Sequence, residues 1–236
     1  MNKVYAVGVG PGSSDYVTKI VEEIIKKSDV VVGYKYTLKT IENFLSGKEV
    51  HEITMETQED VYQKVQKNLG EKTLVIPFTG DVNFSESEVV DRLIEIFGDV
   101  RIVPGISSIQ VAAAKTRVPL DKSKVITMHI STSIKREKID LQKALLDGLS
   151  VVLVPRPWPK ERAKHFMPSE IAFYLKKNGF NTTKLKVHVF ENLTTEKETS
   201  FVGMLNDLEG KEFSDLSVMV IDQSKLDSYI NFNYED

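Results

Sequence analysis

Three glycine-containing turns carry the residue types that most clearly suggest a ligand site in this chain. They read GVGPG at residues 8–12, TGDVNF at 79–84 and PGISS at 104–108. Glycine allows backbone groups to approach a ligand closely, and the aspartate and serines beside it offer hydrogen-bonding oxygens. Each turn taken alone is also an ordinary strand-to-helix connection, because aspartate forms turns and serine caps helices. A shared site therefore requires a fold that brings the three together.

The first turn is a poor phosphate-binding loop. A dinucleotide fingerprint would need a third glycine at Ser13 and an acid at the end of the second strand, where Gly33 and Tyr34 stand. The Gly-Lys-Ser/Thr sequence of a P-loop does not follow, and Pro11 lacks the N–H that a phosphate cradle would use. These departures disfavour a nicotinamide-dependent oxidoreductase.

The elements that would position the turns alternate between strand and helix. Apolar runs at residues 4–9, 29–34, 73–78 and 100–103 are typical of buried strands, and helical patterns lie between them. This alternation predicts an α/β lobe with a mostly parallel sheet. Ligands of such sheets bind at the carboxyl ends of the strands, where all three turns begin. We therefore expect the turns to meet at one edge.

A polar, charged stretch broken by Pro119 separates this lobe from a second one. We predict an N-terminal lobe of residues 1–116 and a C-terminal lobe of residues 120–236. In the second lobe, strand patterns surround a helix near residues 137–147, and residues 186–205 read as two strands joined by a polar turn. The second lobe is therefore predicted to be α/β with a mixed sheet.

Composition limits the classes of function. The chain has 236 residues, a net charge of −3 and no cysteine, which excludes disulfides, thiolate metal sites and a cysteine nucleophile. The net charge disfavours broad nucleic-acid binding, and no apolar run is long enough to span a membrane. We expect a cytoplasmic protein. The scattered histidines show no spacing typical of metal ligands.

The turns also form part of a longer series of motifs. Along the chain stand GVGPG, GYKY, TGDVNF, PGISSIQ and ENLTTEKE, with the order and approximate spacing of the tetrapyrrole (class III) methyltransferases. The chain resembles this family over nearly its whole length. VVGYKY and ENL are most similar to the branch that methylates C5 of cobalt-precorrin-7 in cobalamin biosynthesis. The resemblance implies two α/β lobes, S-adenosylmethionine in the cleft between them, and a homodimer.

The resemblance assigns the cofactor contacts residue by residue. In the N-terminal lobe they are Gly10, Pro11, Gly12, Asp81, Phe84, Ser107 and Ser108, and in the C-terminal lobe Val154, Leu193 and Ser217. S-adenosylmethionine carries a sulfonium cation and no phosphate, so a loop whose proline fixes the backbone while its carbonyls stay available suits it. The chain departs from the family at Val82, where a proline usually follows Gly-Asp.

A tetrapyrrole substrate would be a polycarboxylate, which arginine and lysine recognise. The candidates for substrate binding are Tyr34, Lys35, Arg117, Arg156, Lys160 and Arg162. Residues 155–168 are longer and more basic than the family pattern and contain four prolines, which predicts a loop. This loop is either a lid over the substrate or a solvated excursion. Tyr34 and Tyr36 either line the macrocycle or pack at the strand end.

The implied reaction needs no nucleophile from the protein, because an electron-rich ring carbon attacks the methyl group directly. Alignment at near-attack distance can then supply much of the rate. No catalytic residue and no proton acceptor stands out in the sequence. A decarboxylating C15 methylase, which some members of the branch carry as a fusion, is expected on a separate polypeptide.

Two other interpretations stay open. A sister enzyme of the same fold would act at another precorrin position, on uroporphyrinogen III or in diphthine synthesis. A non-catalytic ligand-binding subunit would keep the fold without the reaction, and no single missing catalytic side chain would reveal it.

Overall fold

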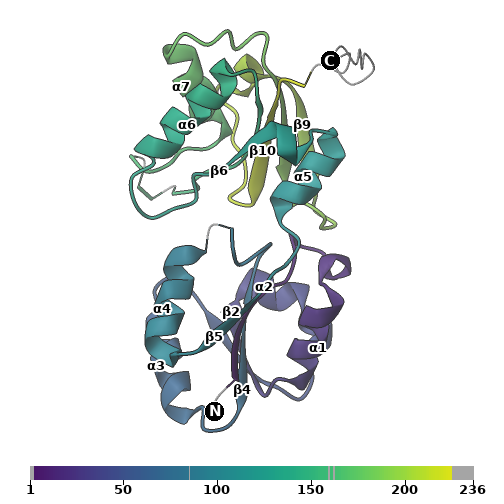
Figure 1. Cartoon of the computed structure of the whole chain (residues 1–236), viewed down its shortest axis with the longest axis vertical. Helices are drawn as coiled ribbons and strands as arrows, with labels where there is room; N and C mark the ends of the chain where they lie inside the picture. The colour runs from purple at the N-terminus through teal and green to yellow at the C-terminus, as the bar shows by residue number, and fades with distance from the viewer. Residues whose placement is uncertain (1–2, 85, 159, 162, 225–236) are drawn as a thin grey trace, which may run out of the picture. The chain divides into compact units, whose positions relative to one another are not determined.

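The computed structural model describes residues 3–84, 86–158, 160–161 and 163–224. They form two compact units, which divide between Ser108 and Ile109 (Figure 1). The predicted boundary, between residues 116 and 120, lies one helix later, after α5 (Ser108–Thr116). From Ile109 onwards this helix is part of the second unit.

The first unit is built on a five-stranded parallel sheet. Its strands are β1 (Lys3–Gly8), β2 (Val30–Tyr34), β3 (Glu49–Ile53), β4 (Thr73–Phe78) and β5 (Val100–Val103). They stand in the order β3-β2-β4-β1-β5, and every neighbouring pair is parallel. The predicted parallel α/β lobe is confirmed. The edge strand β3 has no counterpart among the predicted strands, because it is mostly exposed and polar and lacks an apolar run.

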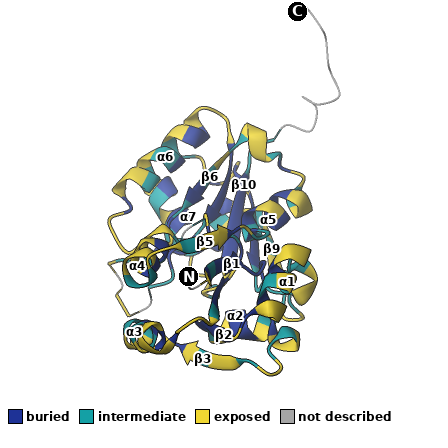
Figure 2. Ribbon diagram, turned by 60° about the horizontal axis from the view of Figure 1, so that its bottom comes forward, coloured by how far each residue is buried: buried dark blue, intermediate teal, exposed yellow. Residues whose placement is uncertain are grey.

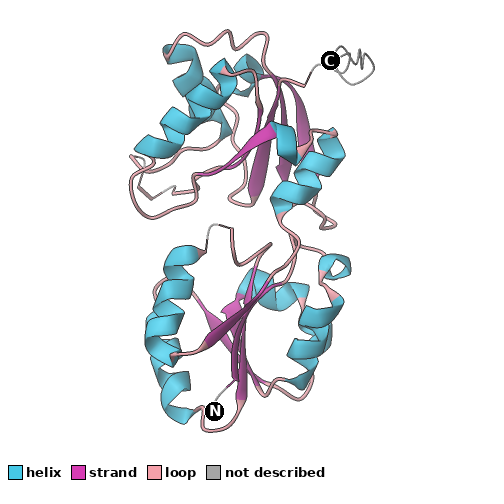
Figure 3. Cartoon of the chain, viewed as in Figure 1, coloured by secondary structure: helices cyan, strands magenta, loops and turns pink. Residues whose placement is uncertain are grey.

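Helices cover both faces of this sheet (Figure 3). They are α1 (Lys19–Lys27), α2 (Lys35–Thr40), α3 (Gln58–Asn68) and α4 (Ser87–Phe97), with 3₁₀ turns at Ser14–Tyr16 and Glu42–Phe44. Val4 of β1 lies in one core with Tyr62 of α3 and Leu93 of α4. Val7 of β1 lies in the other core, with Ile25 of α1. Burial on both faces accounts for the continuous apolar runs of the central strands.

The second unit contains a mixed five-stranded sheet, as predicted. Its elements are β6 (Ser123–Thr127), α6 (Lys135–Leu146), β7 (Ser150–Val154), α7 (Pro168–Lys177), β8 (Lys186–Glu191), β9 (Thr199–Met204), β10 (Ser217–Asp222), and 3₁₀ turns at Leu120–Lys122 and Leu205–Leu208. The order is β6-β7-β10-β8-β9, in which β6 and β7 are parallel and the other neighbours antiparallel. Leu141 of α6 and Ile171 of α7 are fully buried in the core of this unit.

Burial follows the sheets (Figure 2). The central strands are largely buried, whereas the edge strands β3, β5, β6 and β9 and the outer faces of the helices are more exposed. Among the residues that the structure describes, no helix has both the length and the apolar character needed to cross a membrane.

Candidate functional site

The three glycine-containing turns meet at the carboxyl edge of the first sheet. A Cβ atom on Gly8 would lie 2.5 Å from the carbonyl oxygen of Gly80 and 2.6 Å from the amide nitrogen of Gly105. A Cβ on Gly105 would collide with the carbonyl oxygens of the other two glycines. The backbones therefore approach so closely that only glycine fits at positions 8 and 105. The expected meeting of the turns is confirmed.

Hydrogen bonds join the turns as well. The N–H of Gly80 donates to the carbonyl of Gly10 (2.7 Å), and the N–H of Gly10 donates back to the carbonyl of Gly80 (3.2 Å). Both glycines have a positive φ, which residues with side chains rarely adopt. The Asp81 carboxylate accepts from the backbone N–H groups of Asn83 (3.1 Å) and Gly105 (3.4 Å). Asp81 thus ties the second turn to the third.

The residues predicted for the cofactor in this unit surround the junction. None of them is fully exposed: Gly10, Pro11, Gly12, Asp81, Phe84, Ser107 and Ser108 are buried or half-buried. Ser107 lies beside the second turn, since a Cβ on Gly80 would be 3.7 Å from its Cα atom. The Gly12 carbonyl accepts a hydrogen bond from the Thr40 hydroxyl of α2 (3.0 Å). The three turns offer carbonyls, hydroxyls and a carboxylate, and they contain no lysine or arginine.

A second polar group lies where β2 ends, at the same edge. The Tyr34 hydroxyl donates to Gln58 Oε1 of α3 (2.7 Å), and burial raises the pKa of Tyr34 to about 12. Burial also raises the pKa of Glu86, which precedes α4, to about 7. The Glu86 charge in turn helps to raise the pKa of both Tyr34 and Tyr62, so these groups share one environment.

No pattern in the sequence identifies Glu86 as a candidate functional residue. It stands in the run NFSESE, close to Glu88, and no spacing shows which glutamate is half-buried and which is exposed. A partly buried carboxyl group that titrates near neutral pH is a type of group found at functional sites.

The substrate candidates outside the basic segment occupy different settings. Tyr34 packs against the core, in line with the packing alternative, whereas Tyr36 is 65% exposed. Lys35 is exposed and begins α2. Arg117 is exposed and has a φ of 58° directly after α5, a position at which helices often end in the left-handed conformation.

The candidates in the second unit lie at one edge of its sheet. Val154 ends β7, and Ser217 begins β10 opposite Glu191, the last residue of β8. Leu193 follows closely, because the N–H of Asn192 donates to the carbonyl of Leu216, next to Ser217 (2.9 Å). The strand pairing therefore brings Leu193 and Ser217 together, at the end of the sheet where β7 terminates.

Ser217 is the candidate whose surroundings most directly indicate a ligand. Its side chain is buried, and its hydroxyl oxygen has no hydrogen-bond partner among the described residues. A buried hydroxyl without a partner is unfavourable, and such groups in native structures commonly mark a place for a water molecule or ligand.

The turn after β8 is strained. Asn192 and Thr194 both have positive φ, 49° and 69°, and the second value is unusual for a β-branched residue. The Thr194 N–H donates to the Glu198 carboxylate (2.7 Å), which also pairs with Lys115 of α5 (2.6 Å). These contacts hold the ENLT turn in a conformation that it would otherwise avoid, as is common at binding sites.

Backbone hydrogen bonds connect the two ends of the basic segment, residues 155–168, which follows β7. The backbone N–H and carbonyl groups of Arg156 pair with those of Phe166, at 3.0 and 2.9 Å. The Arg156 side chain is 3% exposed, so the solvated alternative is wrong for this residue. Lys160 is exposed. The prediction for Arg162 lies outside the described residues.

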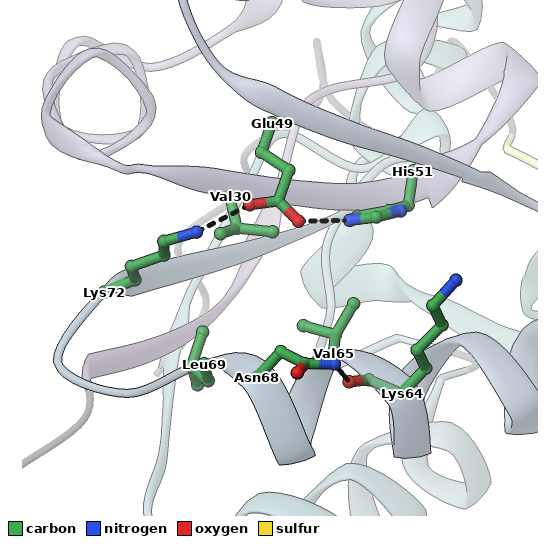
Figure 4. A pocket seen from close by; sticks show the side chains of 8 residues that line it. All are labelled: Val30, Glu49, His51, Lys64, Val65, Asn68, Leu69 and Lys72. Atoms are coloured by element: carbon green, nitrogen blue, oxygen red, sulfur yellow. Dashed lines mark hydrogen bonds and ion pairs between the residues drawn. The ribbon is translucent and has the colours of Figure 1, made fainter.

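A small pocket lies between β3 and α3 (Figure 4). Its volume is about 40 Å³, room for about three water molecules. The Glu49 carboxylate in it is already paired, with Lys72 Nζ at 2.8 Å and with His51 Nε2 at 2.9 Å. The pocket is at the amino end of β3, opposite the turns, and we assign no ligand to it. Within the described ranges, no three His, Asp or Glu side chains are grouped to hold a metal ion.

Comparison with known proteins identifies the family. The model of the Tetrapyrrole (Corrin/Porphyrin) Methylases matches residues 3–209. The chain belongs to this family. Its members are S-adenosylmethionine-dependent C-methyltransferases, and this tetrapyrrole methylase is an enzyme of that class.

Individual relatives agree with the family. A probable cobalt-precorrin-7 C(5)-methyltransferase of Methanocaldococcus jannaschii is 31% identical over 221 residues, which cover 92% of this chain and 96% of the relative. A probable cobalt-factor III C(17)-methyltransferase of the same organism is 25% identical over 230 residues, 92% of this chain and 90% of the relative. The crystal structure of the methyltransferase CobJ has a TM-score of 0.73 over 94% of both chains at 17% identity, which confirms the fold.

The edges of the two sheets suit the methyl donor of this family, each in its own way. The first offers carbonyl oxygens and the Asp81 carboxylate, which attract a sulfonium cation, and the three turns themselves contain no lysine or arginine that would repel one. The second offers the Ser217 hydroxyl, which is buried and available for a hydrogen bond. The residues present therefore fit S-adenosylmethionine.

Proposed function

We propose that this tetrapyrrole methylase transfers a methyl group from S-adenosylmethionine to C5 of cobalt-precorrin-7 in cobalamin biosynthesis. The position is supported by the VVGYKY and ENL motifs and by the relative of 31% identity, which aligns with 92% of this chain. The runner-up is C17 of cobalt-factor III, because the second relative is 25% identical over a similar length.

The observation that carries the donor site is the meeting of the three turns. In our proposal the donor contacts Gly10, Pro11, Gly12, Asp81, Phe84, Ser107 and Ser108 in the first unit and Val154, Leu193 and Ser217 in the second. In this proposal the turns contribute a fixed arrangement of backbone groups, since Gly8, Gly80 and Gly105 are already in close contact and the hydrogen bonds between Gly10 and Gly80 hold the first two turns together.

The chain contributes position rather than covalent chemistry. S-adenosylmethionine supplies an electrophilic methyl group when bound. The Asp81 carboxylate is held by backbone N–H groups and so keeps a fixed orientation at the edge. Preorganised acceptors and correct alignment can supply most of the acceleration of such a displacement. No side chain needs to form a bond with the substrate, because the ring carbon is the nucleophile.

The test is a methylation assay with a panel of corrin precursors. Purified chain is mixed with methyl-¹³C-labelled S-adenosylmethionine and, separately, with cobalt-precorrin-7, cobalt-factor III and cobalt-precorrin-4. We expect the ¹³C label only in the product of cobalt-precorrin-7, at C5, as determined by mass spectrometry and ¹³C NMR. A higher kcat/KM for either of the other two acceptors would overturn the assignment to C5.

We further propose that the enzyme is a homodimer in the cytoplasm. The homodimer is tested by light scattering during gel filtration. A mass twice the 26.7 kDa of one chain is expected, and a mass of one chain would contradict it.

A further inference from the structure

A hollow of about 430 Å³ lies at the start of α6 in the second unit. It is bounded by the turn of residues 131–134, by the first residues of α6, by Arg156 and by Lys164. Four cationic side chains line it, and no aspartate or glutamate does among the described residues: Lys135, Lys138, Arg156 and Lys164. Cations gathered around one hollow favour a bound anion there, and of the four only Lys164 has an ion pair among the described residues, with Glu161.

Arg156 is the buried member of this set. Its guanidinium lies 5.0 Å from the Trp158 ring, and its Nη2 donates to the carbonyl of Ser131 (2.9 Å). Its Nε is buried and has no hydrogen-bond partner among the described residues. A buried, charged N–H group without an acceptor is costly, and the planar guanidinium fork matches the two oxygens of a carboxylate. Arg156 therefore has an unused donor in a closely fixed side chain.

Lys138 stands over two aromatic rings. Its Nζ is 4.1 Å from the centre of the Phe166 ring and 5.1 Å from that of Tyr174. Burial lowers the pKa of Lys138, and the nearby charge of Arg156 lowers it further. Among the described residues, no ion pair is found for Lys135 or Lys138, whereas Lys164 pairs with Glu161 (2.7 Å). Lys135 and Lys138 are thus cations without an ion-pair partner among the described residues, although Glu137 lies between them in the sequence.

The helix itself adds to the attraction for an anion. The position before α6 is Ile134, whose side chain cannot cap the helix, and Lys135 N–H has only a long bond to the Ser133 hydroxyl (3.4 Å). Open N–H groups at a helix start attract negative charge. At the start of α6, Lys135, Arg136 and Lys138 oppose the helix dipole, which favours acidic residues at this end, and Glu137 matches it. A bound anion would remove this conflict.

We propose that this hollow binds a carboxylate arm of the tetrapyrrole substrate, held between the Arg156 fork, Lys138 and the N-terminal amides of α6. The inference rests on the proposed function for the identity of the substrate. Arg156 follows Val154 by two residues, so the hollow lies at the same end of β7 as the proposed donor contacts. A free carboxylate or phosphate shares the same chemistry, and the experiment separates the two sources.

The test measures binding, not turnover. The probe is uroporphyrin III, a stable tetrapyrrole with eight carboxylates, titrated by fluorescence into the chain with S-adenosylhomocysteine present. The variants are Lys135→Gln with Lys138→Gln, and separately Arg156→Lys. The control is Lys143→Gln, which removes an exposed cation from the far end of α6. Circular dichroism and the affinity for S-adenosylhomocysteine verify that each variant is folded.

We expect the double variant to bind uroporphyrin about tenfold more weakly, with a smaller loss for Arg156→Lys and none for Lys143→Gln. Succinate and inorganic phosphate at millimolar concentration should compete poorly. Equal competition by either small anion would overturn the assignment to a substrate arm. No binding to the wild-type chain, or equal affinity in all variants, would overturn the site itself.

The two proposals fail separately. If cobalt-precorrin-7 accepts no methyl group but the variants still weaken uroporphyrin binding, the assignment to C5 is contradicted and the binding site in the hollow is supported. If methylation at C5 is observed but the variants bind uroporphyrin with unchanged affinity, only the proposed binding site in the hollow is contradicted.

Discussion

The glycine edge of the first unit and the basic hollow of the second unit differ in what forms them. At the glycine edge, three backbones are in close contact, the first two exchange backbone hydrogen bonds, and the Asp81 carboxylate joins the third. In the hollow, cationic side chains and the N-terminal amides of α6 surround an open space. Among the described residues, Lys135 and Lys138 have no ion-pair partner and the Arg156 Nε has no acceptor, whereas Lys164 pairs with Glu161. Added atoms should therefore lower stability and ligand affinity at the glycine edge, whereas removal of charge should lower ligand affinity at the basic hollow.

The largest effect is expected at Gly105. In Gly105→Ala the new methyl group meets the carbonyl oxygens of Gly8 and Gly80, so the free energy of unfolding should fall by at least about 2 kcal/mol. S-adenosylhomocysteine binding should be lost with it. Urea unfolding and calorimetry measure the two effects.

Gly70→Ala is the matched control for that variant. Gly70 has a positive φ but nothing within 4 Å of its Cβ position, so only the backbone strain of about 1 kcal/mol is expected. Equal losses in the two variants would show that the turns do not approach as closely as described.

The next effect concerns the unpartnered hydroxyl of the second unit. Ser217→Ala should leave stability unchanged or slightly raised, because it removes a buried polar atom without a partner. Affinity for S-adenosylhomocysteine should fall about tenfold. In the control Ser150→Ala, the buried hydroxyl that accepts from the Gln223 N–H (2.9 Å) is lost, so stability should fall and affinity should not. Unchanged affinity in Ser217→Ala would remove Ser217 from the donor site.

A smaller, several-fold effect is expected from salt. Raising sodium chloride from about 0.05 M to about 0.5 M should weaken uroporphyrin binding, because exposed cations such as Lys135 are screened. In our proposal S-adenosylhomocysteine binds at the glycine edge mainly through backbone groups, so its affinity should change little. Equal salt dependence for both ligands would contradict the contrast between the two regions.

The last effect depends on pH and is a shift in melting temperature at Glu86. Burial raises the pKa of this carboxyl to about 7 in the folded chain, above its value of about 4.5 when unfolded. The folded state therefore binds more protons between these values, and stability contributed by this group falls as pH rises from about 4.5 to about 7.

Glu86→Gln removes the ionisable group and should raise the melting temperature at pH 8 but not at pH 4.5. The control Glu88→Gln removes an exposed carboxylate of α4 and should show no such difference between the two pH values. A rise in melting temperature of Glu86→Gln at pH 4.5 alone would have the opposite pH dependence and would contradict the burial of Glu86.

Much of the fold was predictable because burial leaves a local pattern. Strands buried on both faces, such as β2 and β4, need uninterrupted apolar residues, and these are visible in the sequence. The polar edge strand β3 needs none and was missed. The motif order likewise pointed to the family that the comparison then identified.

The sequence by itself determined the alternation of elements, the mixed character of the second sheet and the residue types offered to a ligand, since each is a property of neighbours along the chain. Only the tertiary structure decided that Gly8, Gly80 and Gly105 touch. It also decided that Arg156 is buried with an unused donor and that Glu86, not Glu88, is partly buried. These facts depend on distances between residues far apart in the chain, which no local pattern records.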